Sequence, residues 1–495
     1  MDRLRAIGRW FDERLHLTQL YESSAGHWIP GRSASWWYVF GSGTLVCLVL
    51  QIVTGICLAL VYVPSPNEAY ASLDYLNYQA SLGWFLRALH NWGSVWMIGL
   101  MTLHVIQVFL FGAYKYPREL TWVLGCVLFL FTLGAAFTGQ IMRFDQDAYW
   151  GLQIGLSIMG RIPFVGPDLV HLVQGGPMIG SETLSRFFSL HVFVIPGLLI
   201  LLVGVHLRLV LMRGINEFPV VGQGVDPETY DAEYEELVQK TGIRFFPTGA
   251  DKDVVFAAFV IMGIVACSAI FGPPIPNGPA DPTLIDTAPR PDFYFLTLFA
   301  AFALMPPYLE DFVIVYVLPV LVLLFFAVPF ISNRGEKHPS KRPGAVILAA
   351  LVMTTLCVLA LEGMRSPWSP KMEAWSGEPV QPRFVEGRSA LELQGAVVLQ
   401  AKQCRNCHAL DGKGGMRGPD LGDVATRLTE DQLVRQVLQG GGNMPAYGKN
   451  LEPEEVTALV AFMRTLHPDN EPPARDSAEP ALPGALSAAA ARQAR

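Results

Sequence analysis

Seven long apolar stretches dominate this sequence of 495 residues. Each is about 20 residues or longer, the length that an α-helix needs to cross the hydrocarbon core of a bilayer. They fall at residues 36–62, 86–113, 121–141, 187–213, 253–273, 312–332 and 344–362. Charged residues make up only 16% of the chain, whereas soluble domains contain about 25%. The sequence therefore predicts a seven-helix transmembrane bundle, and its net charge of -7 argues against a nucleic-acid partner.

Lysine and arginine residues between the spans indicate the orientation of the bundle. They gather before the first span, between the second and third, at the end of the fourth, and between the sixth and seventh. Basic residues accumulate on the cytoplasmic side of a membrane, so we expect the N-terminus to be cytoplasmic and the C-terminus to lie outside. The charged, amphipathic N-terminal segment indicates a surface helix rather than a cleavable signal peptide. We expect the chain to lie in the bacterial cytoplasmic (inner) membrane, in contact with membrane lipid.

Two of the predicted helices carry a pair of histidines each. His90 and His104 are 14 residues apart on the second span, and His191 and His206 are 15 residues apart on the fourth. These intervals are about four helical turns, so each pair lies near one face of its helix, at levels roughly 21 Å apart. A single intramembrane histidine could instead be satisfied by a polar neighbour or take part in a proton path. Two matched pairs favour two bis-histidine haem sites stacked across the membrane.

Glycines and arginines near these histidines are consistent with haem binding. Four glycines on the first and third spans repeat the 14-residue interval, at Gly41 and Gly55, and at Gly125 and Gly139. A glycine lets a flat macrocycle approach the backbone, although small residues also pack helices together. The shared interval favours the macrocycle. Arg87 and Arg186 lie within a turn or two of the outer histidines, where they could pair with haem propionates.

Two long loops on the predicted outer side, at 142–186 and 274–311, hold the other polar features. The second loop contains Pro291-Asp292-Phe293-Tyr294 just before an apolar aromatic run. A carboxylate at the apolar boundary is costly unless it is paired or transfers protons. Asp292 is therefore a candidate for proton transfer, and capping of a short helix or an ion pair with Arg290 are the alternatives.

A soluble domain is predicted at 385–467, after a Pro- and Ser-rich linker at 366–384. Cys404, Cys407 and His408 form a CxxCH sequence, typical of a covalently attached haem whose iron is bound by the histidine. A CxxC pair alone could be a redox or zinc site, but the following histidine favours haem. Met444, in a Gly-Asn-Met-Pro loop, is the predicted sixth ligand. The Pro- and Ala-rich segment 468–495 is predicted to be disordered.

These motifs together resemble the cytochrome b family of quinol-oxidising cytochrome bc complexes, with a mono-haem class I cytochrome c fused behind it. The resemblance covers nearly the whole chain up to about residue 467. The 15-residue interval, and three rather than four helices after the di-haem part, resemble the chloroplast-type cytochrome b and subunit IV joined in one chain. The resemblance implies an all-α fold, with a four-helix di-haem domain at 1–215, a three-helix subunit-IV-like domain at 216–365 and the cytochrome c domain.

The resemblance also implies a function, that of the membrane electron-transfer subunit of a quinol:cytochrome c oxidoreductase. In this family a Pro-Glu-Trp-Tyr motif lines the outer quinol site, and Pro291 to Tyr294 matches it with Asp for Glu and Phe for Trp. Asp292 then becomes the proton acceptor, beside Tyr294, and quinol would bind between the loops around Tyr149 and Asp292. Protons would be released outside and taken up inside.

The implied cofactors are two non-covalent b-type haems, one covalent c-type haem, and quinone or quinol as the substrate. One electron would leave through a separate Rieske-type iron–sulfur protein. That protein would pass electrons to the c-type haem of the C-terminal domain. The other would cross the two b haems to a quinone near the cytoplasmic face. The expected final acceptor is a soluble or membrane-bound c-type cytochrome or an oxidase, and the resemblance suggests a homodimer. The quinone type stays open.

Two departures from the family pattern stand out. The family usually has Leu-Pro-Trp after the glycine that ends the third span, whereas this chain has Met142-Arg143-Phe144. The chloroplast-type branch attaches an extra haem through a cysteine in the first helix, where this chain has Val39, so we expect no such haem.

Three other functions are alternatives to this interpretation. The di-haem membrane anchor of a quinone-linked dehydrogenase needs only four or five helices and no outer Pro-Asp-Phe-Tyr loop. A non-catalytic redox sensor would need an output domain. A transporter would favour internal repeats and discontinuous helices.

Overall fold

The computed structural model describes residues 2–176, 178–281, 283, 290–365, 379–415, 418–441, 444–469 and 471–474. Most of the expected linker and of the expected disordered tail lies outside these residues. Seven helical segments in the described residues are long and apolar enough to cross a membrane, at the predicted positions. They are α3 (Phe40–Ala59), α5 (Gly83–Leu110), α6 (Glu119–Ile141), α9 with α10 (Ser181–Arg213), α12 (Asp251–Phe271), α14 with α15 (Leu309–Ile331) and α16 (Pro343–Met364).

Two of the spans contain a π-helical turn. The fourth span runs from α9 (Ser181–Ser189) through a π turn (Leu190–Val194) into α10 (Ile195–Arg213), and the sixth from α14 (Pro307–Phe312) through Val313–Val317 into α15 (Leu318–Ile331). A proline follows each turn, Pro196 in one span and Pro319 in the other. A proline has no N–H and clashes with the carbonyl four residues before it. A wider turn at this place accommodates the proline without ending the helix.

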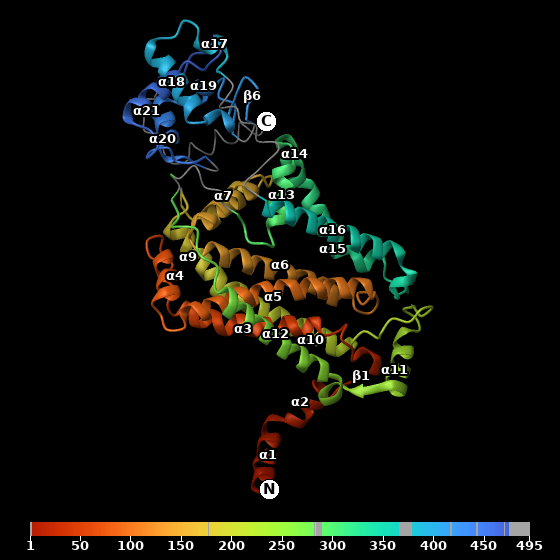
Figure 1. Ribbon diagram of the computed structural model, residues 1–495. Coiled ribbons are helices and arrows are strands. Elements are labelled where there is room, and N and C mark those ends of the chain that lie inside the picture. Colours follow the sequence, from red (N-terminus) through yellow and green to blue (C-terminus); the bar gives the residue numbers. More distant parts are fainter. Residues whose placement is uncertain are drawn as a thin grey trace.

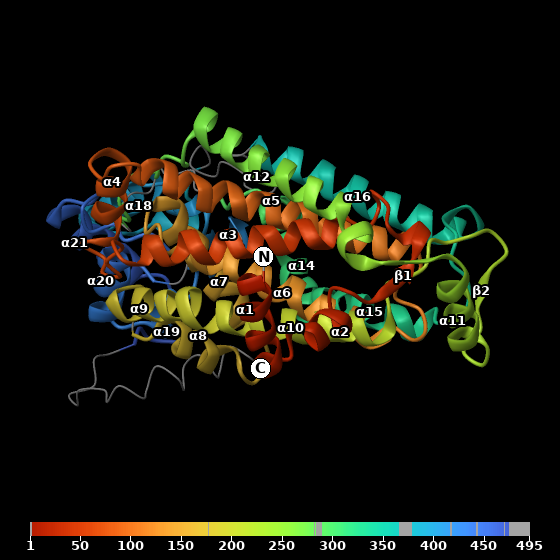
Figure 2. The same cartoon turned by 90° about the horizontal axis from the view of Figure 1, so that it is seen from below.

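The centre of the bundle is apolar. Helix α3 packs along α5, α10 packs along α6, and α12 packs against both α3 and α5. Their shared core consists of Cys47, Leu48, Met97, Leu100, Ile195, Leu199, Val260 and Ile264. Large apolar side chains on the outside of the spans are exposed, for example Leu323 and Ile331. Figure 2 shows the long helices running side by side, as expected for a bundle whose outer surface faces lipid.

Loops and short helices cover the two ends of the bundle. At one end lie α4 (Ala69–Tyr78), α7 (Gln146–Gly160), α8 (Gly166–Gln174) and α13 (Leu296–Leu304), and the C-terminal domain lies at this same end (Figure 1). At the other end, β1 (Trp28–Pro30) pairs with β3 (Gly242–Arg244), and β2 (Gly224–Val225) pairs with β4 (Gly335–Glu336). This end also holds α11 (Tyr230–Thr241), and from it extend α2 (Leu17–Ser23) and the predicted amphipathic helix α1 (Asp2–Leu15).

A buried polar network joins the segments at the end opposite the C-terminal domain. Lys337 Nζ lies 2.6 Å from Glu217 Oε1, and the Tyr230 hydroxyl donates to Glu217 Oε2 at 2.7 Å. Arg118 donates in turn to the Tyr230 hydroxyl at 2.6 Å. Burial lowers the pKa of Lys337 to about 8. The network ties together the second, fourth and sixth connections between the spans.

The C-terminal domain is a small helical unit. It contains α17 (Pro382–Val385), α18 (Ala390–Ala401), α19 (Val424–Arg427), α20 (Glu430–Gln439) and α21 (Pro453–Met463), with the short strands β5 (Ala409–Leu410) and β6 (Lys413–Gly414). Helices α18 and α21 cross closely, because Gly395 lies against the backbone of Ala458. Phe384 is buried in this core, so the packed domain begins slightly before the expected residue 385. The predicted all-α fold, a bundle followed by a small helical domain, is confirmed.

The C-terminal domain contacts a loop at the end of the bundle. Lys449 Nζ lies 3.2 Å from Asp281 Oδ2, and Asn450 donates to the carbonyl oxygen of Thr283 at 2.6 Å. Gln146, at the start of α7, donates to the carbonyl oxygen of Asp281 at 3.2 Å. The loop around Asp281 is thus held from both sides, by the bundle and by the C-terminal domain.

Candidate functional site

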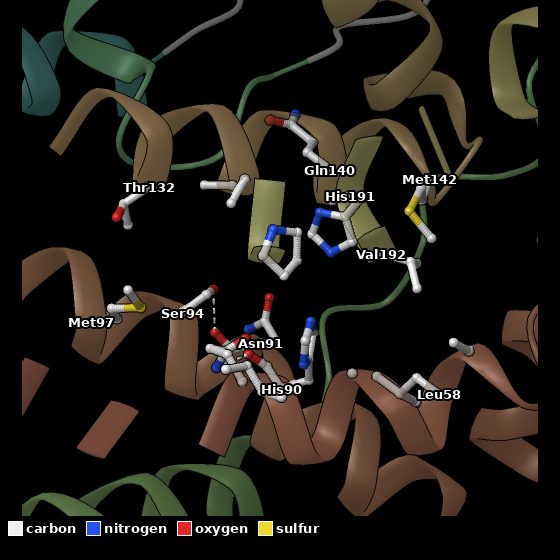
Figure 3. A pocket seen from close by; sticks show the side chains of 18 of the residues that line it. Leu58, His90, Asn91, Ser94, Met97, Thr132, Gln140, Met142, His191 and Val192 are labelled. Carbon is white, nitrogen blue, oxygen red and sulfur yellow. Dashed lines mark hydrogen bonds between the residues drawn. The ribbon is translucent and has the colours of Figure 1, made fainter. Parts of the chain in front are cut away.

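The outer pair of histidines meets in a cavity inside the bundle. His90 on α5 and His191 in the π turn have ring centroids 6.2 Å apart, and both line a cavity of about 610 Å³. Figure 3 shows the two rings directed into this cavity from facing helices. The structure therefore brings together the two residues that were predicted to share the outer level.

Threonine hydroxyls fix the ring nitrogens of this pair. Thr54 Oγ1 lies 2.9 Å from His90 Nδ1, and Thr138 Oγ1 lies 3.1 Å from His191 Nδ1. Each hydroxyl already donates its hydrogen to a backbone carbonyl of its own helix, so it accepts from Nδ1–H. The Nε2 atoms are then left with free lone pairs, which is the form of histidine that binds a metal.

These threonines were missed by sequence reasoning, although a signal was present. Each one directly precedes a predicted haem-contact glycine, so that Thr54-Gly55 on the first span is repeated as Thr138-Gly139 on the third. At the inner level the residues before Gly41 and Gly125 are apolar, and there the pattern is absent.

The inner pair is His104 on α5 and His206 on α10. Within the described residues, His104 Nδ1 is buried without a hydrogen-bond partner. A Cβ atom added at Gly41 would lie 3.2 Å from the His104 ring, and one at Gly125 would lie 3.6 Å from the His206 ring. Glycine thus keeps the backbone of the neighbouring helix open beside each ring.

The same relation holds at the outer level. A Cβ atom at Gly55 would lie 3.2 Å from the His90 ring, and one at Gly139 would lie 2.6 Å from the His191 ring. All four predicted glycines are therefore beside the predicted histidines. Each histidine pair has free imidazole nitrogens. Beside each ring, a glycine leaves the neighbouring helix without a side chain. The two pairs therefore fit two planar haem groups.

The π turn explains why two different histidine intervals fit one geometry. The interval is 14 residues on α5 but 15 on the fourth span, where His191 lies within Leu190–Val194. A π turn accommodates one extra residue in a helix. The extra residue is absorbed there, so both histidines of the fourth span can face those of α5.

The cavity of the outer histidines extends to the Pro291–Tyr294 segment. Asp292 and Tyr294 line it, as does Arg87, which is buried and donates to Asn77 Oδ1 at 3.0 Å and to the Pro274 carbonyl at 2.9 Å. The Tyr294 hydroxyl lies 2.9 Å from Asp292 Oδ2. Burial, reinforced by the neighbouring carboxylate, raises the pKa of Tyr294. Tyr294 therefore remains a hydrogen-bond donor beside Asp292.

Arg143, the residue that departs from the family pattern, pairs with Asp292. Its Nη1 atom lies 3.3 Å from Asp292 Oδ1, and its Nε atom lies 3.4 Å from Asp145 Oδ2. Although burial opposes the charge, the two carboxylates raise the pKa of Arg143. Burial raises the pKa of Asp145, whose Oδ1 atom also caps helix α7 by accepting from the backbone N–H of Ala148. Sequence reasoning noted Arg143 only as a departure and missed Asp145.

Gln140 lines the same cavity and holds the backbone of Asp292. Its Oε1 atom accepts the backbone N–H of Asp292 at 3.4 Å, which fixes the orientation of the amide. Its Nε2 atom is buried and has no hydrogen-bond partner in the described part of the chain, and the amide is directed away from the histidine rings (Figure 3). Gln140 was not identified from the sequence.

Two predicted residues lie elsewhere. Arg186 is exposed and donates to the carbonyl oxygens of His171 and Leu172 in α8, outside the lining of the cavity. Tyr149 is buried under the outer loops among apolar residues, and burial raises its pKa. Tyr149 does not line the cavity in the described residues.

In the C-terminal domain, the histidine of the CxxCH sequence is oriented for iron. His408 Nδ1 lies 2.7 Å from the carbonyl oxygen of Pro419, and it can only donate to that oxygen, which leaves Nε2 free. Burial lowers the pKa of His408, which favours the neutral ring. Gly418 lies directly against this ring, where a Cβ atom would clash. Cys404 and Cys407 form no disulfide within the described residues, so the arrangement fits a covalently attached haem.

Comparisons with known proteins agree with these sites. A family model described as cytochrome b/b6/petB matches residues 27–214, and one described as cytochrome c oxidase, cbb3-type, subunit III matches residues 391–463. Cytochrome b6 of Synechococcus sp. (strain JA-3-3Ab) is 39% identical over 207 residues, which are 42% of this chain and 96% of that protein. Cytochrome b6 of Trichodesmium erythraeum (strain IMS101) is 37% identical over 208 residues, which are 42% and 93%.

A solved structure is also similar. It is described as a hyperthermophilic respiratory Complex III, and the match has a TM-score of 0.60 at 25% sequence identity. The match covers 73% of this chain and 92% of that chain. The likeness therefore extends well beyond the 42% of the chain that the cytochrome b6 relatives cover.

Proposed function

Because the chain belongs to the cytochrome b/b6 family, we propose that it is the membrane electron-transfer subunit of a quinol:cytochrome c oxidoreductase. It is a multi-pass, cytochrome b6-like subunit of a bc-type complex that ends in a c-type cytochrome domain. The observation that carries the proposal is that one cavity is lined both by the outer histidine pair and by Asp292 and Tyr294. With a haem between His90 and His191 in one part of this cavity, a quinol beside Asp292 would lie between a proton acceptor and an electron acceptor.

Oxidation of a quinol to a quinone removes two electrons and two protons. The carboxylate of Asp292 would accept a proton from a quinol hydroxyl, as a positioned general base. Tyr294 and Arg143 hold the two oxygens of this carboxylate at 2.9 Å and 3.3 Å, so its position at the cavity wall is fixed. Gln140 would hold the backbone of Asp292 in place through its Oε1 atom. Tyr149 would act from beneath the loop, as a residue that supports the site.

The b-type and c-type haems implied by the two families supply one-electron carriers when bound. We propose two b haems, held by His90 with His191 and by His104 with His206. We propose a single c haem, attached to Cys404 and Cys407 and held by His408 and Met444. Arg87 would pair with a propionate at the outer level, and Arg186 would need to leave its present carbonyl partners to do so.

The proposed complex includes other proteins. A separate Rieske-type iron–sulfur protein would take one electron from quinol, and a soluble or membrane-bound c-type cytochrome or oxidase would receive electrons from the C-terminal domain. We propose that the chain forms a homodimer in the bacterial inner membrane. The N-terminus would be cytoplasmic and the C-terminal domain periplasmic. The contact of this domain with the loop at Asp281 supports a position beside the quinol site.

The test is quinol oxidation by the purified complex, with Asp292→Asn as the decisive variant. Asparagine keeps the size and hydrogen bonding of the side chain but cannot take the proton, so the rate should fall by about 10²–10⁴. All haems should remain bound, as judged by their absorption spectra. Asp74→Asn, at an exposed position of α4 at the same end of the bundle, is the matched control. If wild-type protein does not oxidise quinol, the function is wrong; if Asp292→Asn is as fast as wild type, Asp292 is only structural.

A further inference from the structure

The loop that carries Met444 is held tightly at the end of α20. The backbone N–H of Met444 donates to the Gly441 carbonyl at 2.9 Å, and the Gly441 N–H donates to the Met444 carbonyl at 3.1 Å. Gly440 and Gly441 have φ of 68° and 154°, values that glycine adopts without the strain a side chain would bring. Met444 is therefore anchored directly to the last turn of this helix.

A side chain on α20 reaches the sulfur atom of Met444. The Nε2 atom of Gln436 lies 3.5 Å from Met444 Sδ, and a thioether sulfur is a weak acceptor. Helix α20 is fixed by its buried side chains Leu433 and Val437, which are 2% and 5% exposed. A Cβ atom at Gly441 would lie 3.3 Å from the same Nε2 atom, so the loop lies against the amide. Gln436 thus meets Met444 from a rigid element.

We propose that Gln436 is a positioning residue that orients the Met444 sulfur toward the haem iron and raises the reduction potential of the c haem. The inference rests on the proposed function, because it assumes that Met444 is an axial ligand. A thioether sulfur has two lone pairs, so one can bind iron while the other accepts from the amide. The positive end of the amide dipole near the sulfur disfavours the oxidised, more positive iron. The hydrogen bond also restricts rotation of a flexible methionine side chain.

The experiment compares Gln436→Leu with Gln439→Leu in the full-length protein, purified in detergent. Gln439 is the last residue of the same helix, and it is exposed, so its replacement controls for the loss of a glutamine. The midpoint potential of the c haem is measured by redox titration, together with the weak red absorption band of ferric haem ligated by methionine. Gln436→Leu should shift the ferric–ferrous equilibrium about tenfold toward ferric, which is about 59 mV lower for one electron. It should also weaken the band, whereas Gln439→Leu should change neither.

A second variant distinguishes loss of the hydrogen-bond donor from misfolding. Gln436→Glu keeps the length of the side chain, and as a carboxylate it cannot donate, so it should lower the potential as well. Covalent haem content, measured by haem staining, shows whether each variant has matured. If Gln436→Leu and Gln436→Glu retain the wild-type potential and band, the inference is overturned.

A Met444→Ala variant separates this failure from a failure of the proposed ligand. If the band is lost in Met444→Ala, methionine ligation is established and the Gln436 results alone decide the inference. If wild-type protein has no such band, or if Met444→Ala keeps it, Met444 is not the ligand. The proposed role of Gln436 is then wrong as well.

Discussion

Arg143 and Asp292 form an ion pair across the wall of the outer cavity, with 3.3 Å between Nη1 and Oδ1. The two residues belong to different loops and are 149 positions apart in the sequence. The guanidinium also lies 3.4 Å from Asp145, whose side chain is 1% exposed. Arg143 thus serves as the counter-ion of a buried carboxylate and of the proposed proton acceptor. The proline typical of the resembled family could serve neither.

Arg143→Gln should destabilise the outer end of the bundle. It leaves the buried carboxylate of Asp145 without its cation, and breaking a buried ion pair by removing one partner costs about 3–5 kcal/mol. The measurement is the temperature at which the b-haem spectrum is lost. The double variant Arg143→Gln/Asp145→Asn should recover most of the loss, because asparagine leaves no unpaired charge and still caps α7. A single variant that melts like wild type would contradict this role of Arg143.

Gln140→Leu should slow quinol oxidation by loosening the backbone of Asp292. It removes the amide oxygen that accepts the Asp292 N–H at 3.4 Å, so the proposed proton acceptor is held less firmly. A neutral hydrogen bond contributes about 0.5–1.5 kcal/mol, which corresponds to a roughly two- to tenfold fall in rate. Steady-state kinetics with a short-chain quinol measure this change, and Gln79→Leu on the exposed surface is the control. A normal rate would show that this hydrogen bond does not position Asp292.

The ratio of haem types should be two b to one c. Two histidine pairs and one CxxCH sequence are present. A pyridine haemochrome spectrum of the purified protein measures this ratio. His206→Leu should reduce it to one to one, because the inner pair loses a ligand while His90 and His191 still face one another at 6.2 Å. A wild-type ratio of one to one would eliminate one of the two proposed b sites.

Acid should loosen the end of the bundle opposite the C-terminal domain through Glu217. Burial opposes ionisation, but Lys337 and Arg118 lower the pKa of Glu217 below its ordinary 4.5. A carboxylate whose pKa is lower in the folded than in the unfolded protein stabilises the fold at pH values above its unfolded-state pKa. This stabilisation is lost as the pH falls through its folded-state pKa. Glu217→Gln should therefore melt at a lower temperature than wild type at neutral pH. The difference should shrink below about pH 4.5, and a difference that does not depend on pH would contradict the proposed linkage.

Much of the fold could be predicted because the signals are local. The seven spans follow from apolar length alone, since a helix in lipid must satisfy its own backbone hydrogen bonds. The CxxCH sequence likewise brings two thiols and a histidine together within one turn. His408 is presented as expected, and the Pro419 carbonyl that orients it belongs to the neighbouring Gly-Pro-Asp segment.

The candidate site was only partly predictable. The four glycines were found from their spacing, and each lies beside a predicted histidine. Thr54 and Thr138 were missed, because a threonine in an apolar helix commonly bonds only to its own backbone. Arg186 was expected to lie near the outer haem because it is close to His191 in the sequence. In the structure its side chain turns to the carbonyl oxygens at the end of α8, which sequence distance does not reveal.

By itself, the sequence determined the spans, the four histidines at matched depth and the attachment motif of the C-terminal domain, because each depends on the periodicity or composition of one continuous segment. Only the tertiary structure decided that Arg143 meets both Asp145 and Asp292, and that the Gln140 amide oxygen accepts the backbone N–H of Asp292. It also decided that a π turn at His191 absorbs the extra residue between the histidines of the fourth span. These features depend on how separate segments pack, and packing is set by burial and pairing across the whole chain.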